Sequence, residues 1–301
     1  MAKATKGKTA KKEEPTTDYT IEEQLVCALA REFGPDDNIT VSGVLNWTFV
    51  AEVLAQRLYA PQISCHQDHF RLSGSGCLVR DHRFPWMVGL PPEDFVSAPL
   101  SSEDIFAMVT GGRWNIVMQP VQVDKHGNCN LALIGDPQKP KKTFVGSRGL
   151  PDNSTNAKRC YFSVPDHTNR VFVEKVDFRS SAGYGPERLA GDIPYGAVHK
   201  IFTNLCVFDI DPKVKQLRLA SVNKGITVEQ VLDNTGFKPI MPTGGVPETC
   251  IPTEEELRMI REIVDSAGIN RLDHGTKEEK AATFAQVNKG TGYQHIFPGR
   301  K

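Results

Sequence analysis

A glycine-containing segment in the middle of the chain has the residue types that bind an anionic group. It reads GSRG at residues 146–149 and follows a short apolar pair that indicates the end of a strand. Gly146 and Gly149 would let the backbone approach a ligand closely, and the planar guanidinium of Arg148 suits a phosphate or a carboxylate. An ordinary turn at a strand exit is the competing interpretation. The chain continues with residues that would hold the loop rigid: Pro151, Asn153 and Asn156.

A second candidate is the polar segment ISCHQDHFRL at residues 63–72. Asp68 could act there as a nucleophile or a general base. A metal site is an alternative, because thiolate, imidazole and carboxylate are zinc ligands. Their spacing matches no zinc motif, so we expect no bound metal, and a polar surface loop is the third interpretation. The residues that a metal site would use are Cys65, His66, Asp68, His69, Cys77 and His82.

The first half of the chain has the pattern of an open α/β sheet. Residues 20–33 place apolar side chains at helical spacing, with Thr20 as N-cap and Glu23 as its capping-box partner. Residues 38–44 predict a short buried strand, and residues 47–61 predict a second amphipathic helix. In such a sheet, ligands gather outside the carboxyl ends of the strands. The segment that contains Asp68 would lie there.

The second half is richer in strands. Its central turn reads DKHGN, in which Asp124 and Asn128 are expected to bond to their own backbone. Gln119 or Gln122, just before that turn, would face a substrate. Strands are predicted at residues 116–123, 131–134, 171–178, 198–210 and 215–222, and helices at residues 227–232 and 253–264.

These elements indicate one domain over residues 18–270. Residues 1–17 contain five lysines and no apolar periodicity, which predicts a solvated, disordered tail. Residues 271–301 form a C-terminal extension whose pattern assigns no fold.

Composition and charge exclude several classes of protein. The chain has 301 residues, with 36 basic against 36 acidic side chains, so its formal net charge is zero. A neutral chain lacks the basic excess on which generic nucleic-acid binding relies. No apolar run approaches the roughly 20 residues of a membrane-spanning helix, and none follows the basic N-terminus as in a secretory signal. Seven cysteines without a CxxC pair indicate reduced thiols and a cytoplasmic location.

An ordered set of motifs resembles the β-type subunit of class I CoA-transferases, above all glutaconate CoA-transferase. It is also similar to the β-type subunit of the ring-opening CoA-thioester hydrolases of bacterial steroid degradation. No single motif carries the resemblance; their order does. The motifs are RLYAP (57–61), QVDKHGNCN (122–130), GDPQKPKKTFVGSRG (135–149), FVEKVDF (172–178), VLDNTGF (231–237) and PTEEELRMIREIVD (252–265).

The resemblance implies an α/β fold with an open, largely parallel sheet flanked by helices and a β-rich second half. It also implies a homologous α-type partner in a heterodimer or heterotetramer, with the active site between the subunits. Acyl-CoA would be the substrate, and no cofactor would be permanently bound. Backbone N–H groups of the glycine loop would stabilise an oxyanion or hold the pantetheine arm. The substrate-binding residues would be Gly146, Ser147, Gly149, Asn153, Asn156, Gln119 and Gln122.

Two positions depart from the transferase pattern. In the transferases a glutamate attacks the acyl-CoA carbonyl and forms a glutamyl-CoA thioester. Counted without a gap from RLYAP, that glutamate corresponds to Asp68, whose carboxylate is shorter by one methylene, about 1.5 Å. A misplacement of about 1 Å can cost on the order of 10²-fold in rate. The glycine loop of the transferases resembles GSGG, whereas the GSRG of this chain, with Arg148, looks more like the loop of the hydrolases. In those hydrolases the α-type partner contributes the catalytic carboxylate.

The sequence thus favours the β-type subunit of a heteromeric CoA-transferase that acts on acyl-CoA thioesters, with Asp68 and Arg148 as catalytic residues. The alternative is the β-type subunit of a ring-opening acyl-CoA hydrolase. A second alternative is a non-catalytic subunit that completes the partner's site. All three place a CoA thioester beside the glycine loop.

Overall fold

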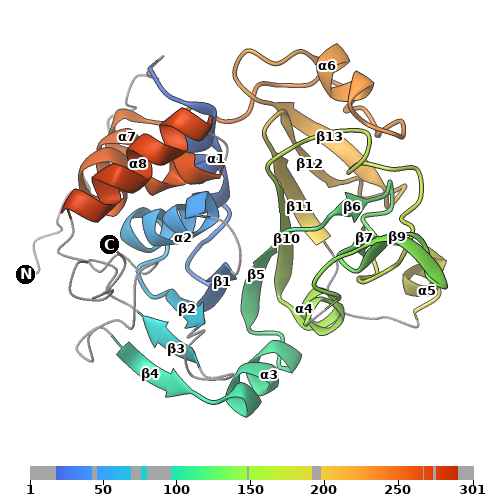
Figure 1. Ribbon diagram of the computed structural model, residues 1–301, viewed down its shortest axis with the longest axis horizontal. Helices are drawn as coiled ribbons and strands as arrows, with labels where there is room; N and C mark the ends of the chain where they lie inside the picture. Colours follow the sequence, from blue (N-terminus) through green and yellow to red (C-terminus); the bar gives the residue numbers. More distant parts are fainter. Residues whose placement is uncertain are drawn as a thin grey trace, which may run out of the picture.

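A computed structural model describes residues 18–42, 46–68, 76–79, 96–147, 149–191, 198–266, 268–273 and 276–290. For residues 42, 66–68, 76–79, 96–100, 102, 105, 106, 187, 284 and 286–290 it describes the backbone alone. One nine-stranded sheet runs through the centre of the molecule, in the order β13-β12-β11-β10-β5-β1-β2-β3-β4 (Figure 1).

The five central strands of this sheet run parallel to one another. They are β11 (Val198–Thr203), β10 (Arg159–Val164), β5 (Trp114–Met118), β1 (Ile39–Ser42) and β2 (Ser64–Asp68). Antiparallel strands complete both edges, with β3 (Gly76–Val79) and β4 (Val96–Leu100) beyond β2, and β12 (Cys206–Ile210) and β13 (Leu217–Val222) beyond β11. The prediction of an open, largely parallel α/β sheet is therefore confirmed.

Two N-terminal helices cover one face of the sheet. They are α1 (Ile21–Ala30) and α2 (Asn46–Leu58), and their apolar side chains pack on Val117, Tyr161 and Phe202 of the central strands. The capping box predicted at the start of α1 is present, because the side chains of Thr20 and Glu23 each accept the other's backbone N–H. Helix α7 (Glu254–Arg258) and a π-helical turn (Met259–Val264) close this layer, so the single predicted helix at 253–264 has two parts.

The opposite face carries shorter elements. On this face, side chains of alternate residues of β10, such as Phe162, pack with Leu150 and Phe172. The side chain of Tyr161, between them in sequence, packs on the other face with the two N-terminal helices. Both faces of β10 are thus buried, as is typical of a central parallel strand. The elements on this side include α3 (Ser102–Thr110), α4 (Leu150–Asn156), α5 (Pro186–Leu189), α6 (Val228–Asp233), and the hairpins β6–β7 (Gln122–Val123, Cys129–Asn130) and β8–β9 (Leu133–Asp136, Lys139–Thr143).

The strand predicted at residues 171–178 is wrong. Its backbone makes single bonds to different neighbours: Val173 N donates to Val123 O, and Gly236 N donates to Phe172 O. Phe172 forms one isolated bridge, to Val123. The predicted strand at 116–123 is likewise divided into β5 and β6, with Pro120, which lacks a backbone N–H, between them.

The C-terminal extension contains structure that the sequence pattern did not assign. A 3-10 turn (Ile269–Leu272) leads to helix α8 (Lys277–Gly290). Asp273, between them, caps the start of α2: its carboxylate accepts Trp47 N at 2.9 Å and Asn46 Nδ2 at 3.0 Å. No helix in the described part of the chain is long and apolar enough to cross a membrane.

Candidate functional site

The carboxyl ends of the parallel strands bring Asp68 and Met118 to the same edge of the sheet. Strand β1 pairs Val41 with both His66 of β2 and Ile116 of β5. Two residues further along, Asp68 and Met118 therefore end their strands at the same level. One strand separates β2 from β5, so the two backbones lie two strand spacings apart, about 10 Å.

The glycine loop lies at this edge, beside the end of β5. The side chain of Asn153, in the first turn of α4, lies against Gly149, where an added Cβ would meet its amide nitrogen at 3.5 Å. The same amide nitrogen is 3.9 Å from the Met118 sulfur. Gly149, Asn153 and Met118 thus form a continuous contact from the loop to the sheet.

A second contact fixes the other side of the loop. Ser147 Oγ donates to Ser180 Oγ at 2.9 Å, and Ser180 Oγ also accepts Leu131 N at 3.0 Å. Gly146 has a φ of 87°, which disfavours any other residue, and an added Cβ there would meet no described atom within 4 Å. The loop therefore has one glycine with open space beside it, immediately before the anchored positions Ser147 and Gly149.

Gln119 and Gln122, both predicted to be near a substrate, have different surroundings. Gln122 is buried, and its side chain donates to Asp177 Oδ2 at 3.2 Å and accepts Asn130 Nδ2 at 2.7 Å. Its Oε1 also accepts Asp177 N at 3.0 Å. Gln119, partly exposed just after β5, has no hydrogen bond to the described residues. Gln119 is thus available to a ligand, whereas Gln122 holds the hairpin in place.

Neither Asp177 nor Asn130 was predicted from the sequence to hold this region together. Asp177 Oδ2 accepts Gly135 N at 2.9 Å, which ties strand β8 of the β8–β9 hairpin to the same cluster. The signal available in the sequence was the polar residue at each end of the QVDKHGNCN motif. Within that motif, the backbone bonds expected of Asp124 are confirmed, because Asp124 Oδ1 accepts the backbone N–H groups of His126 and Asn128 at 3.0 and 3.2 Å. The same expectation for Asn128 is wrong: its side chain donates to the Asp124 carboxylate and accepts the backbone N–H of the distant Gly183 at 2.8 Å.

Asn156 is not brought to the loop. It ends α4, about 10 Å along the helix from Gly149, and its amide donates to Asp152 O at 3.0 Å. Its backbone oxygen faces Gly112, which lies before the start of β5. Asn153 and Asn156 therefore lie near opposite edges of the sheet, although both were predicted to serve the loop.

Two predicted residues have side chains that the structure does not describe. Arg148 lies outside the described residues, and Asp68 is described by its backbone alone. The metal-site alternative falls largely outside as well, since His69 and His82 belong to no described range and only the backbones of His66 and Cys77 are given. Among the described residues, no group of three His, Cys, Asp or Glu side chains could hold a metal ion.

One buried histidine lies at the carboxyl end of β11. His167 has its two ring nitrogens 3.0 Å from the hydroxyl groups of Thr203 and Thr235. Burial lowers the pKa of His167 to about 3, so the ring is neutral at physiological pH. With both nitrogens engaged and 2% of its surface exposed, His167 is part of the core.

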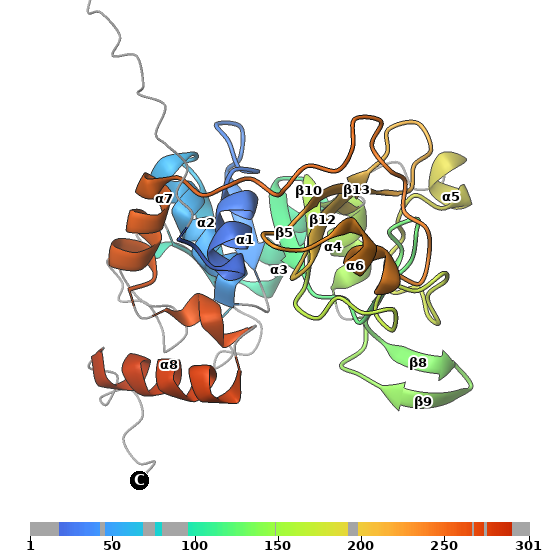
Figure 2. The same cartoon turned by 90° about the horizontal axis from the view of Figure 1, so that it is seen from above.

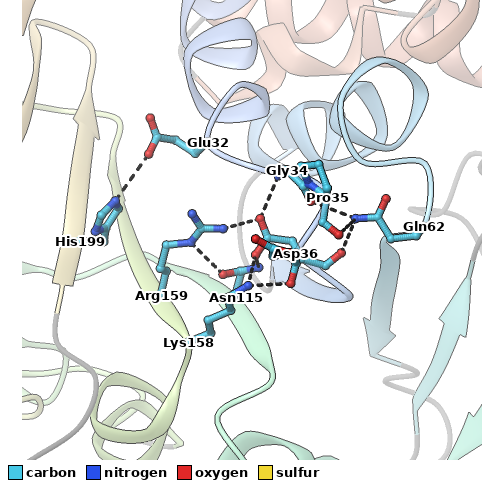
Figure 3. Close-up of polar contacts among 10 residues, drawn as sticks. Glu32, Gly34, Pro35, Asp36, Gln62, Asn115, Lys158, Arg159 and His199 are labelled. Atoms are coloured by element: carbon cyan, nitrogen blue, oxygen red, sulfur yellow. Dashed lines mark hydrogen bonds and ion pairs between the residues drawn. The ribbon is translucent and has the colours of Figure 1, made fainter.

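The densest charged cluster among the described residues lies at the opposite, amino edge of the parallel strands (Figure 3). Asp37, buried just before β1, accepts Lys158 Nζ at 2.9 Å, Asn115 Nδ2 at 2.9 Å and also the guanidinium of Arg159. Burial alone would raise the pKa of Asp37, but hydrogen bonds from Lys158, Asn115, Gly34 N and Arg159 outweigh it and lower the pKa to about 2. This cluster joins β1, β5 and β10 and is structural.

The comparisons with known proteins agree with this architecture. A family model described as Coenzyme A transferase matches residues 23–234. The cholesterol ring-cleaving hydrolase IpdB subunit of Mycobacterium tuberculosis is 31% identical over 245 residues, which cover 80% of this chain and 93% of that protein. The chain belongs to the coenzyme A transferase family.

Within the coenzyme A transferase family, the relatives are β-type subunits, and they are named either as subunits of a ring-cleaving hydrolase or as subunits of a CoA-transferase. The IpdB subunit of Rhodococcus jostii is 40% identical over 165 residues, which cover 54% of this chain and 63% of that protein, less than two thirds of its length. The β-type subunit of glutaconate CoA-transferase from Acidaminococcus fermentans is 26% identical over 275 residues, covering 83% and 94%. The crystal structure of Rhodococcus jostii IpdAB superposes with a TM-score of 0.74 at 29% identity, covering 86% of this chain and all of that one.

Proposed function

We propose that this chain is the β-type subunit of a heteromeric hydrolase that opens a carbon ring in a CoA thioester. The observation that carries the proposal is the combination of GSRG at the glycine loop with an aspartate, not a glutamate, at the end of β2. The relatives named as ring-cleaving hydrolase subunits are 40% identical over 165 residues and 31% over 245, whereas those named as CoA-transferase subunits are 34% identical over 155 residues and 26% over 275.

The glycine loop would hold the acyl group at the carboxyl edge of the sheet. Its backbone N–H groups would stabilise the negative charge that develops on a carbonyl oxygen. Arg148, whose guanidinium binds a carboxylate in a planar, two-pronged arrangement, would hold the new carboxylate of the opened ring. Gln119, which makes no hydrogen bond to the described residues, would line the same space.

Asp68 would not form a covalent intermediate. Its carboxylate is one methylene shorter than the glutamate of the transferases, about 1.5 Å, and such a displacement weakens a nucleophilic attack strongly. The carboxylate that activates water would come from a homologous α-type partner, facing the glycine loop across the subunit interface.

The reaction balances without a cofactor. Water adds to a ring carbonyl carbon and loses a proton to the partner's carboxylate. The bond between that carbon and its neighbour breaks, the neighbour takes up the proton, and the ring opens to a carboxylate. CoA stays attached to the product and is not a resident group.

Five of the six described free cysteines are buried, which suits a reducing compartment such as the cytoplasm.

An isotope-exchange assay on the complex with its partner tests this proposal. Glutaconyl-CoA with labelled glutaconate should give no exchange of label into the thioester, and borohydride added during turnover should not inactivate the enzyme. Exchange and borohydride inactivation would instead reveal an enzyme–CoA thioester and overturn the hydrolase proposal.

A CoA-transferase is the second candidate, because Asp68 ends β2 level with Met118 and so brings a carboxylate to the correct edge of the sheet. It predicts exchange that Asp68→Asn abolishes. A non-catalytic subunit is the third, and it predicts that neither Asp68→Ala nor Arg148→Ala changes turnover or the KM of the complex.

A further inference from the structure

The β8–β9 hairpin presents three exposed lysines, Lys139, Lys141 and Lys142. None of them forms an ion pair with a residue that the structure describes. The hairpin stands out from the body of the molecule as a separate arm (Figure 2). One carboxylate, Asp136, lies on the same arm, and it accepts the backbone N–H of Gln138 at 2.8 Å. In a chain with zero net charge, this arm is a local concentration of positive charge.

Two of these lysines are positioned by packing within the hairpin. A register shift at Ile134/Gly135 leaves Lys141 without a paired residue on β8, and such bulges redirect side chains. The Lys141 side chain passes over Gly135, where an added Cβ would meet its Cγ at 3.2 Å. Lys142 Nζ lies 4.8 Å from the centre of the Phe144 ring. Exposed lysines with fixed stems present a more ordered charge than lysines on a mobile loop.

The arm leads directly to the glycine loop. Strand β9 ends at Thr143, Phe144 N donates to Ala132 O at 2.9 Å, and Gly146 follows two residues later. At a strand rise of about 3.3 Å, Lys142 lies roughly 13 Å and Lys139 roughly 23 Å of extended chain from Gly146. Asp177 holds Gly135 on the other strand, so the arm is tied to the same polar cluster as Gln122. These chain lengths are upper limits, so the lysines lie within the reach of a CoA molecule whose thioester is at the loop.

We propose that Lys139, Lys141 and Lys142 bind the phosphate groups of the CoA nucleotide while the thioester lies at the glycine loop. This inference rests on the proposed function, because it takes a CoA thioester as the substrate. Ammonium groups bind phosphate as point charges and do not require a fixed fork. A basic arm beside the site would also attract the multiply charged nucleotide from solution and speed its association.

Calorimetry tests this inference by measuring how three free ligands bind to the complex of this chain with its partner. The ligands are CoA, CoA lacking the 3′-phosphate, and pantetheine. The variant K139Q/K141Q/K142Q should weaken CoA binding by about 10-fold or more and leave pantetheine binding unchanged, with an intermediate loss for the ligand without the 3′-phosphate. The matched control K213Q/K238Q/K277Q removes the same charge from exposed positions outside the arm and should bind CoA normally.

Three results would overturn the inference. Equal CoA affinity of the native and lysine-arm complexes would show that the arm does not contact the nucleotide. Equal weakening of CoA and pantetheine would show an effect through the shape of the loop. Loss of the partner from the variant in size-exclusion chromatography would show that the arm binds an acidic protein surface instead. If the native complex binds no CoA at all, the proposed function itself fails, and that outcome is distinct from these three.

Discussion

The Asn153 side chain links the glycine loop to the central sheet, with its amide nitrogen 3.9 Å from the sulfur of Met118. It packs against Gly149 on one side and against the last residue of β5 on the other. The position of the loop above the strand ends therefore depends on this amide together with the hydrogen bond between Ser147 and Ser180.

Replacement of Asn153 by alanine should lower kcat/KM of the assembled enzyme by about 10- to 100-fold, because a loop displaced by about 1 Å loses its alignment with the reacting carbonyl. Asn156→Ala is the matched control. It removes the same side chain from the far end of α4 and should leave kcat/KM within about twofold. Equal losses in both variants would show that α4 as a whole, and not the loop contact, is affected.

Gln122→Ala should destabilise the protein by about 1–3 kcal/mol, because it removes three hydrogen bonds, including the one from the amide of the buried Asn130. Gln119→Ala, three residues earlier and without a hydrogen bond to the described residues, should change the free energy of unfolding by less than about 0.5 kcal/mol. Urea unfolding of the two variants compares them directly. A stable Gln122→Ala protein would mean that the cluster does not hold the hairpin.

The Asp37 cluster should make stability depend on acid. The pKa of Asp37 is about 2 in the folded chain, below its usual value of 3.8. The stability that its charged form contributes is therefore complete above pH 3.8 and is lost as the pH falls toward 2. Thermal unfolding of the native chain should show a fall across this window that is shallower in Asp37→Asn.

At neutral pH, Asp37→Asn should cost about 1.5–3 kcal/mol, because Lys158 and Arg159 lose hydrogen bonds to a charged acceptor. Activity at a temperature well below unfolding should be unchanged, since the cluster lies at the edge of the sheet opposite the glycine loop. A variant with native stability but reduced kcat would contradict the structural assignment of this cluster.

Asp273→Ala should destabilise the protein by about 1 kcal/mol through the loss of the cap on α2. Asp273→Asn retains an oxygen that can accept Trp47 N and should be within a few tenths of a kcal/mol of the native chain. Denaturant unfolding of both variants measures the difference. If the alanine and asparagine variants are equally destabilised, charge and not capping is the source of the effect.

Local signals predicted the elements better than they predicted the site. The capping box at Thr20 and the buried runs of β1 and β11 could be found because each depends on neighbouring residues. Residues 171–178 alternate like a strand, but their backbone partners are Val123 and Gly236, and no property of the segment itself selects these partners.

The same limit separates the site residues. Gln119 and Gln122 look equivalent in sequence, and only the fold brings Asp177 and Asn130 to one of them. Asn153 and Asn156 are likewise distinguished only by the direction of α4. The glycines and the arginine at the loop, by contrast, were selected by residue type alone, and their role stays a prediction.

Turnover in heavy-oxygen water tests the central claim most directly. The complex of this chain with its partner is given the CoA thioester of a cyclic β-diketone acid, and the products are weighed by mass spectrometry. Ring opening at the glycine loop predicts a product that keeps CoA and carries one labelled oxygen in its new carboxylate, with formation slowed in Arg148→Ala. Transfer of CoA to an added carboxylic acid, with the ring intact and no label gained, would contradict it.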